Sequence, residues 1–246
     1  MKIKPIIIIL LCACLTLLSG CVRYEVGIDL VHQHRGAIVQ NIKLGEQLTS
    51  FSQSEAEKWL KSLEKRTKKL GGKVKKISEQ ELQINIPFGN TEELASKFNQ
   101  FFNPNGQNST EDLENTNLLE LTSEMKVKHS NLLLLERDYI DLTVDLRGLG
   151  VLSEQGKLIV SPGSLVDLKL RLNAPWGAKN IISDSSTNSP PVSKKAKQLI
   201  WQLQPGQINH IEVIFWLPSH LGIGTVIIFI LLFFAYRVKY GSTKLN

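Results

Sequence analysis

Apolar residues recur along the chain with two different periods, and these periods predict most of its elements. Residues 24–30 alternate between apolar and polar side chains, which predicts a half-buried strand. A second apolar stretch over 37–44 follows the polar segment 32–36, so we expect the two strands to form a hairpin. Shorter apolar stretches predict further strands at 73–77 and 81–86.

Two segments carry the 3.6-residue period of amphipathic helices. Ser52 followed by Glu55 fits a capping box, which predicts that the first helix begins after Ser52, and the glycines at 71–72 predict its end. Asn90 followed by Glu93 predicts the start of the second helix in the same way. The apolar stripe of the first helix is Ala56, Trp59, Leu60, Leu63, Thr67 and Leu70, and the inward residues of the second are Leu94, Ala95, Phe98 and Phe102.

The second half of the chain is rich in strands. The expected strands cover 125–129, 132–135, 139–146, 158–160, 165–172, 198–203 and 208–217. Polar stretches rich in turn-forming residues predict flexible loops over 103–117 and 183–197. This order of elements predicts an α+β domain over residues 21–212, with an antiparallel sheet and two helices packed on one of its faces.

An apolar segment near the C-terminus predicts a transmembrane helix over 215–237. Its length matches the ~20 residues that cross the hydrocarbon core of a bilayer. Pro218 fits the first turn of such a helix, and Trp216 fits its interfacial end. Arg237 and the basic residues after it place the tail, 238–246, in the cytoplasm by the positive-inside tendency, so we expect the domain to be exported.

The N-terminus has the features of a bacterial lipoprotein signal. A basic start precedes an apolar stretch that ends in Leu18-Ser19-Gly20-Cys21, which resembles a lipobox. We therefore expect residues 1–20 to be removed as a signal peptide and Cys21 to carry a diacylglycerol, with palmitate as an expected acyl group. An uncleaved signal anchor with a chance cysteine is the alternative. We expect both anchors in one membrane, and no disulfide in the mature domain, because the other cysteines lie in the signal.

The chain has a formal net charge of +6, and many of its basic residues gather around the first predicted helix. Lys58, Lys61, Lys65 and Lys68 recur at helical spacing opposite the apolar stripe. An ordinary solvated helix face explains this pattern, and so does contact with anionic lipid headgroups or an acidic partner. A lysine near an anionic membrane contributes about 1 kcal/mol, but only within a Debye length of the surface. Export of the domain excludes nucleic acid as a partner.

Residue types that catalyse reactions form no recognised motif in this sequence. It contains no phosphate-binding loop, HExxH, nucleophile elbow or dinucleotide fingerprint, which does not exclude an enzyme but gives no argument for one. His32 and His34 share one side of the predicted hairpin, yet zinc needs three or four ligands, so we interpret them as polar residues of a hairpin tip and expect no metal or cofactor. We interpret Asp138, Asp141 and Asp145 as outward, solvated residues of a strand.

Residues 24–29 (YEVGID) and 34–44 (HRGAIVQNIKL) resemble an uncharacterised family of membrane proteins, a domain of unknown function known from cyanobacteria and plastids. This resemblance implies a link to photosynthetic membranes or photosystem assembly. More distantly, the chain is similar to the LppM-type lipoproteins of actinobacteria. There a lipobox, an exported α+β domain, a late Trp-containing strand (here Trp201 with Gln204-Pro205-Gly206) and a membrane helix follow in the same order, which implies a domain that handles lipids or glycolipids.

The sequence therefore favours a membrane-anchored lipoprotein that serves as a non-enzymatic accessory or assembly factor. We expect it in the cell inner membrane or the thylakoid membrane, with most of the chain on the extracytoplasmic or lumenal side. There it is expected to bind membrane lipids or a membrane-protein partner. The alternative is a carrier or processing protein for lipids or glycolipids, which requires an apolar cavity between the sheet and the helices.

Overall fold

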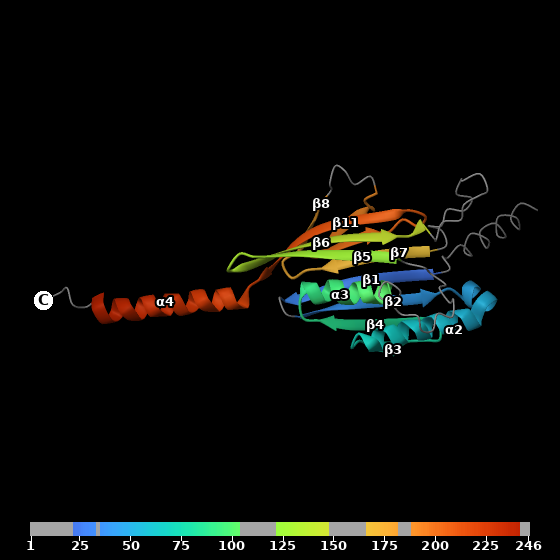
Figure 1. Ribbon diagram of the computed structural model, residues 1–246, viewed down its shortest axis with the longest axis horizontal. Helices are drawn as coiled ribbons and strands as arrows, with labels where there is room; N and C mark the ends of the chain where they lie inside the picture. Colours follow the sequence, from blue (N-terminus) through green and yellow to red (C-terminus); the bar gives the residue numbers. More distant parts are fainter. Residues whose placement is uncertain (1–21, 33–34, 104–121, 148–165, 182–187, 242–246) are drawn as a thin grey trace, which may run out of the picture.

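The computed structural model of the protein describes residues 22–32, 35–103, 122–147, 166–181 and 188–241. These residues form two β-sheets, two helices that pack on them, and a third helix that projects from one end of the domain (Figure 1). The α+β class expected from the sequence is confirmed. The signal segment, Cys21, His34 and the predicted strand at 158–160 lie outside the described residues, as does almost all of the predicted loop at 103–117.

The described residues build one sheet of seven strands and one of four. In spatial order the seven-stranded sheet consists of β3 (Lys73–Lys76), β4 (Glu81–Phe88), β2 (Arg35–Leu44), β1 (Val22–His32), β7 (Val166–Asn173), β10 (Gln198–Gln202) and β9 (Val192–Lys195). The four-stranded sheet consists of β5 (Thr122–Asn131), β6 (Leu135–Asp145), β11 (Ile208–Pro218) and β8 (Ala178–Ile181). The predicted β1–β2 hairpin is confirmed, and all neighbouring strands are antiparallel except β1 and β7, which run parallel.

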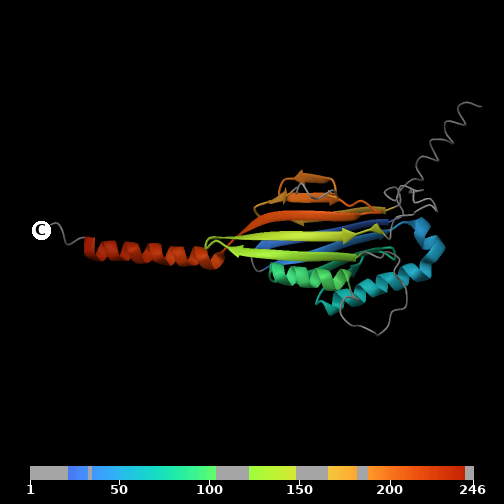
Figure 2. The ribbon, with the colours of Figure 1, turned by 45° about the horizontal axis from the view of Figure 1, so that its top comes forward.

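One face of the seven-stranded sheet is covered by the four-stranded sheet and by α2 (Glu46–Lys69) and α3 (Thr91–Phe102), as Figures 1 and 2 show. Trp201 of β10 is buried, and its Nε1 donates a hydrogen bond to Asn180 Oδ1 of β8 over 2.9 Å, which joins the two sheets. Elsewhere in the core, the rings of Tyr24 in β1 and Trp59 in α2 lie 6.4 Å apart. Both helices lie on one face, as predicted, whereas the sequence did not show that a second sheet shares this face.

Helix α2 has the predicted apolar stripe but a different beginning. It starts at Glu46 after Gly45, so Ser52 lies inside the helix and is not its N-cap. A capping box is a short pattern that also occurs by chance within helices, because serine costs little in a helix interior. The predicted end is confirmed, since Gly71 has a φ of 72° and the N–H of Gly72 bonds to the carbonyl of Thr67. The buried stripe residues are Ala56, Trp59, Leu63, Thr67 and Leu70, with Leu60 partly buried.

Helix α3 begins where the sequence predicted. Asn90 Oδ1 accepts a hydrogen bond from the N–H of Glu93 over 2.7 Å, which makes Asn90 the N-cap. The Glu93 carboxylate accepts from the N–H of Gly89, one residue earlier than in a standard capping box. Of the predicted inward residues, Leu94 and Phe98 are fully buried and Ala95 and Phe102 are partly so, and Phe101 is a buried residue that the sequence pattern did not include.

Two asparagines of α3 protect the free edge of the four-stranded sheet. Asn99 accepts from the N–H of Met125 over 2.7 Å and donates to its carbonyl oxygen over 2.9 Å, so its amide pairs with β5 as a neighbouring strand would. Asn103, one helical turn later, makes the same two contacts with the backbone of Ser123. Unpaired edge strands promote association with other chains, and these two amides occupy part of this edge.

Three other expectations for the second half are corrected. The apolar run 132–134 is the exposed turn between β5 and β6 and not a strand. Strand β9 falls within the predicted loop 183–197; its four residues are all exposed, so it has no alternation to detect. Strand β8 was not predicted, because its four residues are too few to show a repeating pattern.

The projecting helix starts later than the sequence predicted. β11 continues to Pro218, which pairs with Leu135 of β6, so Pro218 ends a strand and does not open the helix. Phe215 also belongs to β11 and is buried in the core. The helix, α4 (His220–Gly241), is long and apolar enough to cross a membrane over His220–Tyr240, with a mean hydropathy of 2.3.

The start of β1 and the start of α4 lie at opposite ends of the domain (Figures 1 and 2). β1 runs from Val22 toward the end from which α4 leaves, and there the ring of His32 lies 5.7 Å from that of His220. Only Ser219 separates β11 from α4, and its N–H donates to the carbonyl oxygen of Leu134 over 2.9 Å. The residue that precedes α4 is therefore fixed to the turn between β5 and β6 by a hydrogen bond.

The pairing of α3 with β5 leads to a stability prediction. Replacing Asn99 by Leu leaves the N–H and carbonyl of Met125 without this partner, and each unpaired group costs about 1–3 kcal/mol when water cannot reach it. We expect Asn99→Leu to lower the free energy of unfolding of the full chain in detergent by about 1–3 kcal/mol in urea titrations. Gln100→Leu, at an exposed position of the same helix, should change it by less than about 0.5 kcal/mol. Equal effects of the two changes would contradict this role of Asn99.

Candidate functional site

The four lysines singled out from the sequence form one exposed surface of α2. We call Lys58, Lys61, Lys65 and Lys68 the basic surface; all four are exposed. Lys68 Nζ lies 2.7 Å from Glu64 Oε1, and this hydrogen bond lowers the pKa of the Glu64 carboxyl. The opposite side of α2 is fixed in the core, so the lysines are held on a rigid support.

The basic surface is remote from the end of the domain that carries α4. Helix α2 ends beside the middle of β4, where a Cβ on Gly72 would lie 2.8 Å from the carbonyl oxygen of Asn85. Asn85 pairs with Val39, which pairs with Gly27, and Gly27 precedes His32 by five residues of strand, ~17 Å at ~3.3 Å per residue. From there α2 extends further away from α4 (Figure 2). Because the Debye length is about 8–10 Å in physiological salt, lipids around α4 would attract this surface only weakly if α4 spans a membrane upright.

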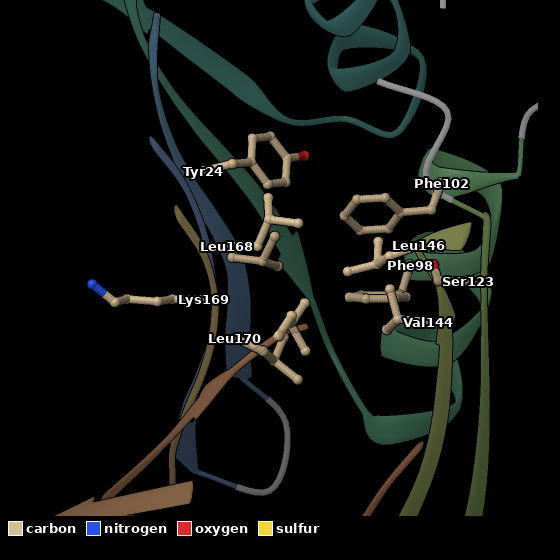
Figure 3. Close-up of a pocket in the computed structure, with 11 residues that line it drawn as sticks. Tyr24, Phe98, Phe102, Ser123, Val144, Leu146, Leu168, Lys169 and Leu170 are labelled. Atoms are coloured by element: carbon tan, nitrogen blue, oxygen red, sulfur yellow. The ribbon is translucent and has the colours of Figure 1, made fainter. Parts of the chain in front are cut away.

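A small apolar cavity lies where a carrier would need its binding pocket. It sits between β1 and β7 on one side and α3 and β6 on the other, and Figure 3 shows Tyr24, Leu168, Phe98 and Phe102 around it. Its volume is ≈ 30 Å³. Pockets that bind small molecules measure about 300–1,000 Å³, so this part of the core is too well filled to hold an acyl chain.

Asp138 is buried, which corrects the expectation that it is an outward, solvated residue. It is 1 % exposed, and its Oδ1 accepts hydrogen bonds from Thr91 Oγ1 over 3.0 Å and from His129 Nδ1 over 2.8 Å. Asp141 and Asp145 do lie on the outer face, where they contact His210 and Arg147. The period of a strand carried the signal: position 138 shares its parity with the buried apolar positions 140, 142 and 144, and positions 141 and 145 do not.

The cluster around Asp138 is built for structure rather than for nucleophilic catalysis. The Thr91 hydroxyl donates to the carboxylate and not to His129, so the order nucleophile, imidazole, carboxylate of a catalytic triad is not formed here. The hydrogen bond to Asp138 raises the pKa of His129, and the nearby carboxylates of Glu136 and Glu92 act in the same direction. The cluster joins β5, β6 and the first turn of α3.

The remaining candidates for chemistry give no ligand set in the described part of the chain. His32 contacts His220, and His34 lies outside the described residues. Within those residues no group of three or more His, Cys, Asp or Glu side chains is placed to hold a metal ion.

The sequence did not predict an open groove between the two sheets, which lies beside β8 and β11 on one side and β9 and β10 on the other. Its volume is ≈ 450 Å³. It is lined by Trp176, Lys179, Lys194, Leu199 and Trp216. Trp176 is 59 % exposed, and a tryptophan between Pro175 and Gly177 in a turn was the one sequence signal for this surface.

Comparisons with known proteins give a family and one solved structure with weak similarity. A family model described as "Protein of unknown function (DUF3153)" matches residues 27–240. The NMR structure of the folded domain of Mycobacterium tuberculosis LppM is similar at a TM-score of 0.39 and 11 % identity, covering 82 % of this chain and 93 % of that one. No curated protein sequence matches the chain. The resemblances to a domain of unknown function and to LppM-type lipoproteins, expected from the sequence, are confirmed at this level.

The raised pKa of His129 predicts a pH dependence of stability. Protonated His129 is favoured in the folded state, so its contribution is complete below the unfolded pKa of about 6.5 and is lost as the pH rises through the raised folded value. We expect the urea midpoint of the wild-type chain to fall between about pH 6 and 8. The His129→Gln variant should lose part of this fall, and the same slope in both proteins would contradict the role of His129.

Proposed function

Because the chain belongs to the DUF3153 family, whose description assigns no activity, we propose its function from the structure: a membrane-anchored accessory or assembly factor that binds an acidic membrane-protein partner. α4 crosses the membrane, and the two-sheet domain stands on the extracytoplasmic or lumenal side of the inner or thylakoid membrane. Partner binding occurs on the basic surface of α2, without a chemical reaction. Arg237 and Lys239 follow the apolar part of α4 and favour a cytoplasmic tail.

The observation that carries this proposal is the rigid display of four lysines away from the end that carries α4. A lipid-binding helix is most effective when its cationic face lies within a Debye length of the headgroups. The basic surface lies beyond that distance when the domain extends from α4 as Figure 2 shows. An acidic surface on the extramembrane part of a neighbouring protein can reach it, and charge complementarity would then guide the two proteins together.

A carrier of lipids or glycolipids is a weaker candidate for this chain. The apolar cavity between the sheets and α3 has a volume of ≈ 30 Å³, about a tenth of the smallest ordinary ligand pocket. The groove beside Trp176 is larger, but it is open to solvent and does not enclose an apolar chain.

Charge reversal of the basic surface tests the proposed partner contact. The test variant combines four substitutions: Lys58→Glu, Lys61→Glu, Lys65→Glu and Lys68→Glu. We expect it to reduce partner recovery at least ten-fold when the tagged chain is purified from native membranes, because four attractive charges become repulsive. The matched control reverses four exposed lysines on other elements, which should leave recovery unchanged. These control residues are Lys126, Lys128, Lys179 and Lys194.

Three outcomes would count against the proposal. Unchanged recovery after reversal of the basic surface would remove α2 from the interface. Equal losses in both quadruple variants would show a general effect of net charge. Binding of wild type but not of the α2 variant to anionic vesicles, without a co-purified protein, would favour the lipid interpretation instead.

We also propose that Cys21 is lipidated after removal of residues 1–20. Mass spectrometry of the mature wild-type chain should then find Cys21 as its first residue with a diacylglycerol attached. Cys21→Ser should retain the N-terminal segment, because the processing signal needs the cysteine, whereas Cys12→Ser and Cys14→Ser should be processed normally. A wild-type chain that still begins at Met1 would contradict the lipidation.

A further inference from the structure

The turn between β5 and β6 exposes three leucines in succession. Leu132, Leu133 and Leu134 are 60 %, 62 % and 42 % exposed. In Figures 1 and 2 the tip of this hairpin is the part of the domain that reaches furthest along α4. Three adjacent exposed leucines are unusual in a tight turn, where polar residues and glycine are favoured. We call residues 132–134 the leucine tip.

The backbone of the leucine tip shows that a leucine is held there at a conformational cost. Leu133 has a φ of 68°, a left-handed conformation that glycine or asparagine adopts more easily than leucine. Asn131 Oδ1 accepts from the N–H of Leu133 over 2.9 Å, and the N–H of Leu132 donates to the carbonyl oxygen of Leu135 over 2.8 Å. The turn is thus well ordered by hydrogen bonds, and both its conformation and its exposure to water favour other residues than leucine.

The leucine tip lies against the first turn of α4. A Cβ on Gly222 would lie 1.5 Å from the carbonyl oxygen of Leu133, so the glycine makes this close approach possible. The N–H of Ser219 donates to the carbonyl oxygen of Leu134 over 2.9 Å. Where α4 enters a bilayer, the leucine tip therefore enters at the same depth.

The length of α4 gives the tip an apolar environment to enter. Its uncharged part from Leu221 to Tyr236 is ~24 Å long at ~1.5 Å per residue, a few ångströms short of the ~30 Å hydrocarbon core. A short apolar segment draws its flanking residues toward the bilayer. On the domain side, Leu133 and Leu134 approach the first turn of α4, so the leucine tip flanks its apolar segment.

We propose that Leu132, Leu133 and Leu134 insert into the acyl region of the outer leaflet beside α4. The inference rests on the proposed membrane span and goes beyond it, because it assigns a second membrane contact to the folded domain. Acyl chains cover the leucines that water would otherwise contact, and the two contacts together hold the strands of the domain upright on the membrane. This orientation keeps the basic surface of α2 away from the headgroups.

Site-specific photo-crosslinking of the full chain tests the insertion. A diazirine analogue of leucine is placed at position 133. The labelled chain is reconstituted into vesicles of phosphatidylcholine and phosphatidylglycerol and illuminated. The mass of the chain is then measured. Position 228 in the middle of α4 is the positive control, and position 79, exposed in the turn between β3 and β4 at the opposite end of the domain, is the negative control. The leucine analogue matches Leu133, is an apolar side chain of similar size to Ile228, and replaces the exposed Glu79.

We expect phospholipid adducts from positions 133 and 228 and none from position 79. An adduct at 228 without one at 133 overturns the insertion and leaves the membrane span intact. The absence of adducts at both positions overturns the span as well, so the two failures are distinguishable. A protein adduct at position 133 in native membranes, without a lipid adduct, assigns the leucines to a protein interface and also overturns the insertion.

Discussion

The rest of the domain depends on the pairing of β1 along both of its edges. β1 binds β2 as a hairpin and β7 as a parallel partner, so it joins the first half of the chain to the second. Across this parallel pair Arg171 binds Asp29 over 2.7 Å and Glu25 over 3.3 Å. Gly27 lies between the two acids, and a Cβ there would come within 2.5 Å of the guanidinium, so the glycine leaves room for the arginine to lie across β1. On the inner face of the strand Tyr24 donates to Gln40 over 2.8 Å.

This arrangement gives the domain two functional ends. The strands of both sheets run roughly along the direction of α4, so their turns gather at one end of the domain near α4 and at the other end far from it (Figure 1). The apolar turn at residues 132–134 lies at the first end, and the basic surface of α2 begins beyond the middle of the domain. Apolar and cationic contacts are therefore separated along the axis of the molecule and are suited to different partners.

Local sequence patterns predicted most of the elements, but they did not predict which distant strands pair with each other. The β1–β2 hairpin and α3 were predictable because alternation, turn residues and the cap at Asn90 are all contained in short stretches. The β1–β7 pair was not, because a parallel partner can lie anywhere along the chain. The later boundary of α4 escaped because Phe215 is as apolar as a membrane residue, although it is buried between the sheets.

Sequence reasoning about the candidate site succeeded where helical spacing was enough. The lysines of α2 are exposed together, as their spacing of three and four residues implies. The leucines at 132–134 were assigned to a strand because apolar content alone does not distinguish a buried strand from an apolar turn. Asp138 was misassigned because it was grouped with two aspartates of opposite parity.

The direction of β1 places the N-terminal end of the domain far from α4. Val22 and His32 are ten residues apart along β1, a rise of ~33 Å at ~3.3 Å per residue, and Val22 lies at the end far from α4. A lipid on the adjoining Cys21 would start at this height and not at the foot of the domain. If the domain stands upright beside a membrane-spanning α4, this height separates such a lipid from that membrane, so placing both anchors in one membrane, as the sequence predicts, would require the domain to tilt.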